Sequence, residues 1–389
     1  MRGRTLGLGA LACLLTVPAL ACGDDDGGGG AFDGGGGGGG DLATVSEALA
    51  VLPDDGEDQL VVWGDVARAA EIAGIERPAA DAGEDAVFDY LNTVTGVMRE
   101  DGATTTPVAI APPDAAHVER AVDIAAFAAD VGWTFLQVDR FVERQSPPDS
   151  ITVLAGEFDD GALTDAMGEP TDDVWVAGTG TPDEPDLRNS TAARPLGESL
   201  WLSRQAGDGL LSITRDPEGQ VTADAALTGD PEGEVLADDA TLAGVAAALD
   251  EQSAYAAMVA RPGANGMGAI GTATPEQAEQ LCEGMLPQPS AAVATGVTAD
   301  DEGPVLLIAL AHLSADAASA NADALEEIVT DGASAVSREP WSERIELDGV
   351  ETTGDDDLVV VARLRPVDPI GTRLWYDVLF QRDNLVASC

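Results

Sequence analysis

The sequence predicts an α+β fold in which a disordered, glycine-rich N-terminal tether precedes two subdomains, each an antiparallel sheet with helices. Three observations support this prediction. The composition is globular from Leu42 to the last residue, runs of strand length alternate with runs of helical periodicity, and short turns join successive strands. Because about 345 residues are long for one hydrophobic core, two subdomains are expected, at residues 42–262 and 263–389.

The first expected subdomain begins with helices and continues with strands. Asp65 is a candidate helix cap, and Pro147-Pro148 must interrupt regular structure between two strands. Helices are expected at residues 42–52, 65–74, 84–101, 117–130, 159–167 and 240–249. Strands are expected at residues 59–63, 133–138, 151–155, 174–176, 199–204, 209–215, 220–227 and 254–259.

The motif Asp-Pro-Glu-Gly occurs at residues 216–219 and again at residues 230–233. Proline at the second position and glycine at the fourth are typical of a type I turn, so the first copy is expected to join two strands of a meander. Calcium ligation by the two motifs is the alternative. Their spacing does not match the 12-residue loop of an EF-hand, which favours turns.

The second expected subdomain follows a glycine-rich linker at residues 263–271. A phosphate-binding loop at Gly266 and Gly268 is the alternative, but the full dinucleotide-binding spacing is missing. The strand–helix–strand segment 151–176 looks like a weaker version of the unit that follows the linker, so an internal repeat stays open. The expected elements are helices at 275–284, 314–329 and 370–382, and strands at 291–298, 305–311, 345–347 and 358–364.

Charge excludes several classes of function. The 389 residues contain 70 acidic and 19 basic side chains, all of the bases are arginine, and the formal net charge is −51. Without lysine the chain cannot form a Schiff base, a Walker A phosphate loop or a Ser-x-x-Lys nucleophile. Such acidity also opposes contact with a phosphate backbone, so nucleic acid is not an expected partner.

No motif assigns a catalytic residue, a cofactor or a metal ion. His117 and His312 are the only histidines, and the sequence lacks Gly-x-Ser-x-Gly, His-Glu-x-x-His and Cys-x-x-Cys. His312 follows an expected strand, where a hydrogen-bonded structural histidine is favoured over a member of a catalytic triad. Pairs of carboxylates stay open in so acidic a chain, which keeps a carboxylate-based hydrolase as an alternative. The six tryptophans are expected in the core, at positions 63, 133, 175, 201, 341 and 375.

The N-terminal residues have the three parts of an export signal. Arg2 and Arg4 form a basic head, residues 6–20 form an apolar run too short to span a membrane, and small or apolar residues precede Cys22. The ending Ala-Leu-Ala-Cys resembles the lipobox of bacterial lipoproteins, although Ala19 stands where that family more often has leucine. The resemblance implies cleavage after residue 21 and a diacylglycerol on Cys22. An ordinary secretory signal cut near Ala21 is the alternative.

Residues 22–41, which would follow the cleavage site, are rich in glycine and aspartate. Glycine this dense has no side chains to bury and loses the most backbone entropy on folding, so these residues are expected to be a disordered tether with a reach of roughly 25 Å. A metal site at Asp24, Asp25 and Asp26 is the alternative, but adjacent carboxylates on a flexible chain are not preorganised. The segment after the tether is similar to uncharacterised actinobacterial lipoproteins in its Leu-Pro opening, its Pro147–Asp159 stretch and its closing cysteine. That resemblance implies no function for any residue.

Two cysteines would remain as thiols after cleavage and lipidation, Cys282 and Cys389. Disulfides persist outside the cytoplasm, so an even pair there is expected to form a bridge that fastens the C-terminus. Two unpaired thiols are the alternative.

Together these patterns predict a lipid-anchored protein on the extracytoplasmic face of a cell membrane. The expected role is non-enzymatic, either structural or in binding an envelope protein or a small ligand. A transporter's solute receptor would need two similar lobes with a cleft, whereas the chain is expected to be uneven and antiparallel. A deep pocket with converging polar groups would favour ligand binding or catalysis.

Overall fold

The computed structural model describes most of the chain from Leu42 onward. The expected signal peptide at residues 1–21 and the tether at residues 22–41 lie outside the described residues. The described residues are 42–56, 59–79, 82–96, 108–116, 124–146, 149–180, 184, 186–205, 209–228, 233–261, 284–354, 356, 358–367, 372–381 and 383–388. No helix among them is long and apolar enough to cross a membrane.

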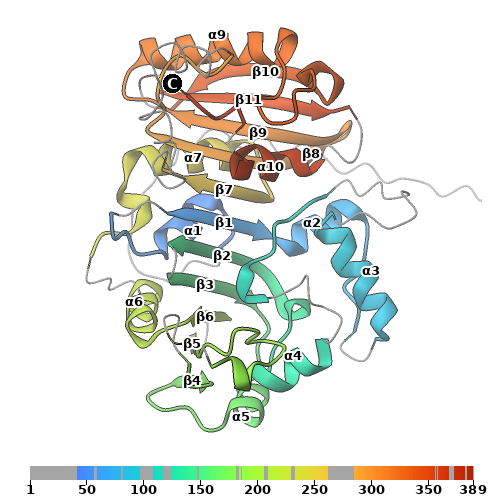
Figure 1. Cartoon of the computed structure of the whole chain (residues 1–389), viewed down its shortest axis with the longest axis vertical. Coiled ribbons are helices and arrows are strands. Elements are labelled where there is room, and N and C mark those ends of the chain that lie inside the picture. Colours follow the sequence, from blue (N-terminus) through green and yellow to red (C-terminus); the bar gives the residue numbers. More distant parts are fainter. Residues whose placement is uncertain are drawn as a thin grey trace, which may run out of the picture. The chain divides into compact units, whose positions relative to one another are not determined.

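The strands of the described residues form one 11-stranded sheet in which all neighbours are antiparallel, which confirms the predicted α+β fold. They are β1 (Leu60–Asp65), β2 (Val138–Ser146), β3 (Asp149–Gly156), β4 (Val174–Ala177), β5 (Leu200–Gln205), β6 (Leu210–Thr214), β7 (Ala256–Ala260), β8 (Ala292–Asp300), β9 (Gly303–Ala311), β10 (Ile345–Thr353) and β11 (Val359–Pro366). The order is β10-β11-β9-β8-β7-β1-β2-β3-β6-β5-β4, which Figure 1 shows from top to bottom.

The expected boundary at residue 262 falls between β7 and β8, which pair directly with each other. Both expected subdomains therefore contribute strands to the same sheet. That the two subdomains are separate folding units stays a prediction.

Helices cover both faces of the sheet, so its strands are buried on two sides. In β9, for example, Leu306 and Ile308 pack into one apolar cluster, whereas Val305 and Leu307 pack into the other. The helices α1 (Val45–Ala50), α6 (Pro217–Leu227) and α7 (Ala240–Glu251) cover the second face. The first face is covered by α2 (Val66–Ala73), α3 (Glu84–Val94), α4 (Ile124–Val131), α5 (Asp160–Met167), α9 (Ala315–Asp331) and α10 (Leu374–Gln381).

Aspartates begin several of these helices. The Asp65 side chain accepts a hydrogen bond from the backbone N–H of Arg68, and α2 then ends at Gly74 in the left-handed conformation. Asp159 caps α5 and Asp239 caps α7 in the same way. A carboxylate at this position satisfies N–H groups that the helix itself cannot pair. The predicted cap at Asp65 is confirmed.

The strand expected at residues 220–227 is wrong, because these residues belong to helix α6. The Asp-Pro-Glu-Gly motif at 216–219 begins that helix instead of closing a turn. Asp216 Oδ1 accepts a hydrogen bond of 2.7 Å from the backbone N–H of Gly219, and Pro217 occupies the first helical position. Proline is favoured there because its missing N–H would have no partner in the helix.

The strand expected at residues 133–138 is also wrong. Residues 135–137 form a 3₁₀ turn, and β2 begins only at Val138. The turn is held at its start, where the backbone N–H of Thr134 donates to Gln137 Oε1 at 2.8 Å. The apolar run Trp133 to Leu136 therefore packs into the core as part of a turn. The strand at residues 138–146 was not predicted because its charged residues interrupt the apolar pattern. The helix and linker expected at 275–284 and 263–271 lie outside the described residues.

The sheet repeats one connectivity on either side of its centre. The order β1-β2-β3-β6-β5 on one side matches β7-β8-β9-β11-β10 on the other, and β4 adds an edge strand to the first series alone. Helices α1 and α7 precede β1 and β7 and share a face, and α5 and α9 follow β3 and β9 on the opposite face. Because β1 and β7 are antiparallel, with Val62 opposite Met258, the two series are related by an approximate two-fold axis through that pair.

Candidate functional site

A buried glutamate interrupts the apolar face of the sheet in the N-terminal half. Glu143 on β2 is fully buried, and it shares its face with apolar residues such as Phe141 and Leu154. Its Oε2 accepts a hydrogen bond of 2.8 Å from Thr152 Oγ1 on β3. Its Oε1 accepts hydrogen bonds from Gln145 Nε2 at 2.6 Å and from the backbone N–H of Asp114 at 3.3 Å. Glu143 therefore joins two strands to the segment at residues 114–116.

The environment of Glu143 favours its protonated form. Burial raises the pKa of this carboxyl above its usual value of 4.5, and the nearby Asp114 raises it further. The hydrogen bonds from Gln145, Thr152 and Asp114 lower the pKa but offset only part of that effect.

A tight loop before β5 places a second glutamate, Glu198, over the same face. Gly197 adopts a left-handed φ of 72°, and a Cβ at this position would lie 2.0 Å from the carbonyl oxygen of Asp186, so only glycine fits. The backbone N–H of Ser199 then donates to the carbonyl of Gly180 at 2.8 Å. This contact fixes Glu198, which lies between the two constrained residues.

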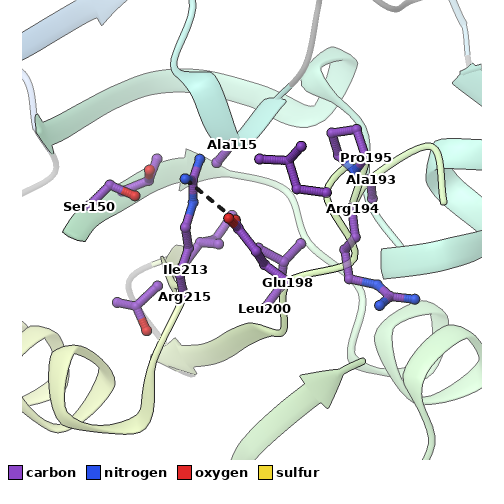
Figure 2. Close-up of a pocket in the computed structure, with 12 residues that line it drawn as sticks. Ala115, Ser150, Ala193, Arg194, Pro195, Glu198, Leu200, Ile213 and Arg215 are labelled. Carbon is purple, nitrogen blue, oxygen red and sulfur yellow. Dashed lines mark ion pairs between the residues drawn. The ribbon is translucent and has the colours of Figure 1, made fainter. Parts of the chain in front are cut away.

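A cavity of about 60 Å³ lies between this loop, residues 114–116 and strands β3, β5 and β6. Glu198 Oε2 lies 3.5 Å from Arg215 Nη1, and both side chains are largely buried, with 14% and 26% exposed. Figure 2 shows the guanidinium and the carboxylate pointing toward each other. The cavity is lined by Ala115, Ser150, Thr152, Ala193, Arg194, Pro195, Leu196, Glu198, Leu200, Ile213, Thr214 and Arg215.

Arg194 lines the cavity, but its charged group points away from Arg215 and Glu198 (Figure 2). The guanidinium lies against Gly178, where a Cβ would come within 2.1 Å of Nη1. Its Nε and Nη1 are buried and have no hydrogen-bond partner within the described part of the chain. Only the backbone and the aliphatic part of Arg194 are therefore assigned to the cavity.

The C-terminal half lacks this polar arrangement at the matching positions. Pairing across the sheet runs from Val62 to Glu143 and Thr152 on one side, and from Met258 to Thr295 and Ile308 on the other. Thr295 therefore matches Glu143, and Ile308 matches Thr152. The remaining gap there is about 10 Å³. Apart from Thr295, it is lined by apolar side chains from β9, β10, β11 and α10, together with Trp341 and Leu385. The matching positions are thus filled mainly by apolar side chains, and among the described residues that line this gap the pair of Glu198 and Arg215 has no counterpart.

Glu143, Glu198 and Arg215 were not predicted from the sequence. Glu198 and Arg215 lie just outside strands β5 and β6. For Glu143 the usable signal was its alternation with Phe141 on β2, because alternate residues of a strand face the same side. In β2 that signal was hidden by neighbouring charges at Asp139, Arg140 and Arg144.

The expected lipidation site at Cys22 and the expected bridge between Cys282 and Cys389 lie outside the described residues. Described residues near the two later cysteines do meet. Leu286 forms an isolated β-bridge with Ser388, and the backbone N–H of Leu286 donates to the carbonyl oxygen of Ala387 at 3.1 Å.

His312 occupies a structural position after β9. It is buried, its Nδ1 lies 3.3 Å from the carbonyl of Pro289, and its Nε2 lies 3.5 Å from Asn321 Nδ2. Burial lowers its pKa, which favours the neutral ring. His117 lies outside the described residues. Five of the six tryptophans are buried as expected, whereas Trp201 on β5 is only partly buried.

Acidic side chains are numerous, but within the described ranges no three of His, Cys, Asp or Glu gather as they would around a metal ion.

Comparison with known proteins gives no assignment. No protein-family model matches the chain, and no curated protein matches it. A solved structure described as "Structure of crystal form I of TP0453" aligns with a TM-score of 0.37 and 7% sequence identity, covering 87% of this chain and 98% of the other. At this TM-score the similarity assigns neither a family nor a function.

Proposed function

We propose that the chain is a non-enzymatic binding protein held by a lipid on Cys22 at the extracytoplasmic face of a cell membrane. The observation that supports binding is the polar cavity of Glu198 and Arg215, because the matching place in the other half is filled by apolar side chains and Thr295. Apolar walls with a few placed polar groups that fix orientation are typical of ligand sites, and this cavity has that composition on a small scale.

The sequence of residues 1–41 supports the anchor. Its lipobox-like ending supplies Cys22, and its glycine-rich stretch would hold a domain clear of the membrane. Two acyl chains on one residue give stable attachment, whereas one chain is marginal. Anionic head groups would repel so acidic a domain, so the lipid alone would retain it.

Fractionation of cells that express the full chain tests the anchor. We expect the wild-type chain in the membrane fraction and the Cys22→Ser variant released into the medium. Cys13→Ser is the matched control, because Cys13 would be removed with the signal and its loss should not alter retention. If the Cys22→Ser variant still sediments with membranes, the anchor lies elsewhere and the proposal fails.

A further inference from the structure

We propose that the cavity beside Glu198 and Arg215 receives a neutral primary amide, such as a side-chain carboxamide. This inference rests on the binding function proposed above and names the chemistry that the site would recognise. The amide N–H would donate to Glu198, and its carbonyl oxygen would accept from Arg215. Both groups lie in the lining and point toward each other.

The two charges argue against a charged ligand. A carboxylate could pair with Arg215, but it would also lie next to Glu198 in a protein of net charge −51. An ammonium group could pair with Glu198, but it would then meet the guanidinium of Arg215. A neutral group with one donor and one acceptor can bridge both side chains without adding a charge to a largely buried site. An amide is the common group with this pattern.

The separation within the ion pair suits such a bridge, because an N–H and the carbonyl oxygen of a primary carboxamide point to the same side. Glu198 Oε2 and Arg215 Nη1 are 3.5 Å apart, which is longer than a charge-assisted hydrogen bond of about 2.7–2.9 Å. Arg365 and Asp300 elsewhere in the chain reach 2.7 Å. The loose pair therefore keeps hydrogen-bonding capacity that an inserted group can use.

The walls indicate what flanks the amide. Ile213 and Leu200 are buried apolar residues of the lining, whereas Leu196 is a lining residue that is 51% exposed. A ligand at the cavity would thus meet apolar surface both inside and at the loop. Since the cavity measures only about 60 Å³, one small group enters it and the rest of the ligand stays outside.

Ligand-detected NMR on the full chain in detergent micelles tests the proposal with three small probes of similar size. The probes are acetamide, acetate and methylammonium, measured separately at the same concentration and salt. We expect acetamide to bind the wild-type chain more tightly than either ion. This ranking needs no substitution, so it decides the question even if a variant fails to fold.

Two substitutions locate the binding. Arg215→Gln should weaken acetamide binding by about tenfold, because a hydrogen bond to a charged donor is lost. Glu198→Gln should retain acetamide and admit acetate, because the repelling carboxylate is gone. Arg140→Gln is the matched control, since Arg140 pairs with Asp65 at nearly the same exposures, 29% and 13%, outside the cavity lining. It should leave all three affinities unchanged.

Binding of acetate or methylammonium in preference to acetamide would overturn the proposal, and so would the absence of binding by every probe. Acetamide binding that Arg140→Gln weakens as much as Arg215→Gln would place the site elsewhere and overturn it too. These outcomes are separate from the fractionation result. If Cys22 retains the protein at the membrane but acetamide does not bind, only the proposed ligand class is wrong, and the proposed anchor stands.

Discussion

At the scale of single residues, the two halves of the sheet differ in where they bury polar side chains. The positions of Glu143 and Thr152 are matched by Thr295 and Ile308. The N-terminal half therefore has the carboxyl group of Glu143 where the C-terminal half has the hydroxyl group of Thr295. A buried carboxyl costs folding free energy unless its hydrogen bonds are complete. Glu143 has three neutral donors, which hold the walls of the cavity in place.

Replacement of Glu143 by glutamine should change how stability depends on pH. The pKa of Glu143 is raised in the folded state, so the folded chain binds the proton more tightly than the unfolded chain. The contribution of Glu143 to the free energy of unfolding therefore falls as pH rises from 4.5 toward the raised pKa, and below 4.5 this contribution is fully present. The Glu143→Gln variant should lack that fall.

Urea unfolding across this pH range, followed by circular dichroism, gives both curves. The glutamine amide can keep its oxygen toward Asp114 and Gln145 and donate to the Thr152 hydroxyl, so it should fold. We expect the difference in unfolding free energy to shift in favour of Glu143→Gln as pH rises. A constant difference at every pH would show that Glu143 titrates as it does in the unfolded chain.

At the scale of elements, helix α6 is attached to the sheet by a polar contact. Gln220 Nε2 donates to Ser212 Oγ at 2.6 Å and to Asp224 Oδ1 at 2.9 Å. Ser212 on β6 in turn donates to Asp224 Oδ1 at 3.2 Å. Ala223 and Leu227 add apolar contacts to the same interface. Helix α6 therefore depends on its hydrogen bonds and on its N-terminal cap.

Removal of that cap should destabilise the protein measurably. Asp216→Ala deletes the acceptor of the 2.7 Å bond from Gly219, and loss of an N-cap of this type costs about 1 kcal/mol. Asp216→Asn is the matched control because it keeps an acceptor oxygen, and it should cost less. Urea unfolding of the two variants at one pH measures both effects. Equal losses would mean that the charge, and not the cap, is the important feature.

The elements that could be predicted from the sequence are those with local signals. Asp65 and Gly74 bound α2, and the apolar runs of β3 and β9 appear where they were expected. The failures have local causes too. Asp-Pro-Glu-Gly suits both a turn and a helix start, so residues 220–227 were assigned to a strand. The candidate site was missed because it depends on β2, β3, β6 and the loop before β5 coming together, which no local pattern encodes.

At the scale of the whole molecule, the bridge between Cys282 and Cys389 stays a prediction that the surrounding contacts favour. Leu286 pairs with Ser388, so the described chain near the two cysteines is already adjacent. In the chain-entropy model, a bridge closing about 100 residues adds roughly 4–5 kcal/mol of stability. Digestion of the exported protein under non-reducing conditions should yield a peptide pair that joins the two residues. Labelling of both thiols in unreduced protein would contradict the bridge.

Charge makes a second prediction at this scale. Loss of Arg2 and Arg4 with the signal would leave a net charge of −53. Arg363 and Arg365 pair with Asp300 and Asp348, but such pairs are few against 70 acids, so repulsion should dominate. The screening length falls from about 8 Å at 0.15 M salt to about 3 Å at 1 M. We therefore expect a higher melting temperature in 1 M than in 0.05 M sodium chloride.

Thermal unfolding of the full chain at the two salt concentrations, followed by circular dichroism, checks this expectation. Sodium sulfate at equal ionic strength serves as a comparison, because it also stabilises proteins by exclusion from their surface. An unchanged or lower midpoint in sodium chloride would show that the acids are well spaced or well paired.

The central pair of strands has a consequence for how the chain reaches this structure. Strand β1 comes early in the sequence but borders β7, with Leu60 opposite Ala260. Helix α1 is likewise held by α7, where Asp250 accepts hydrogen bonds from the backbone N–H groups of Val45 and Ser46. Contacts between such distant positions form slowly, because a long loop must close first. Until β7 has been synthesised, one edge of β1 has unpaired backbone N–H and C=O groups. A growing chain would therefore expose an aggregation-prone strand edge during about half of its synthesis.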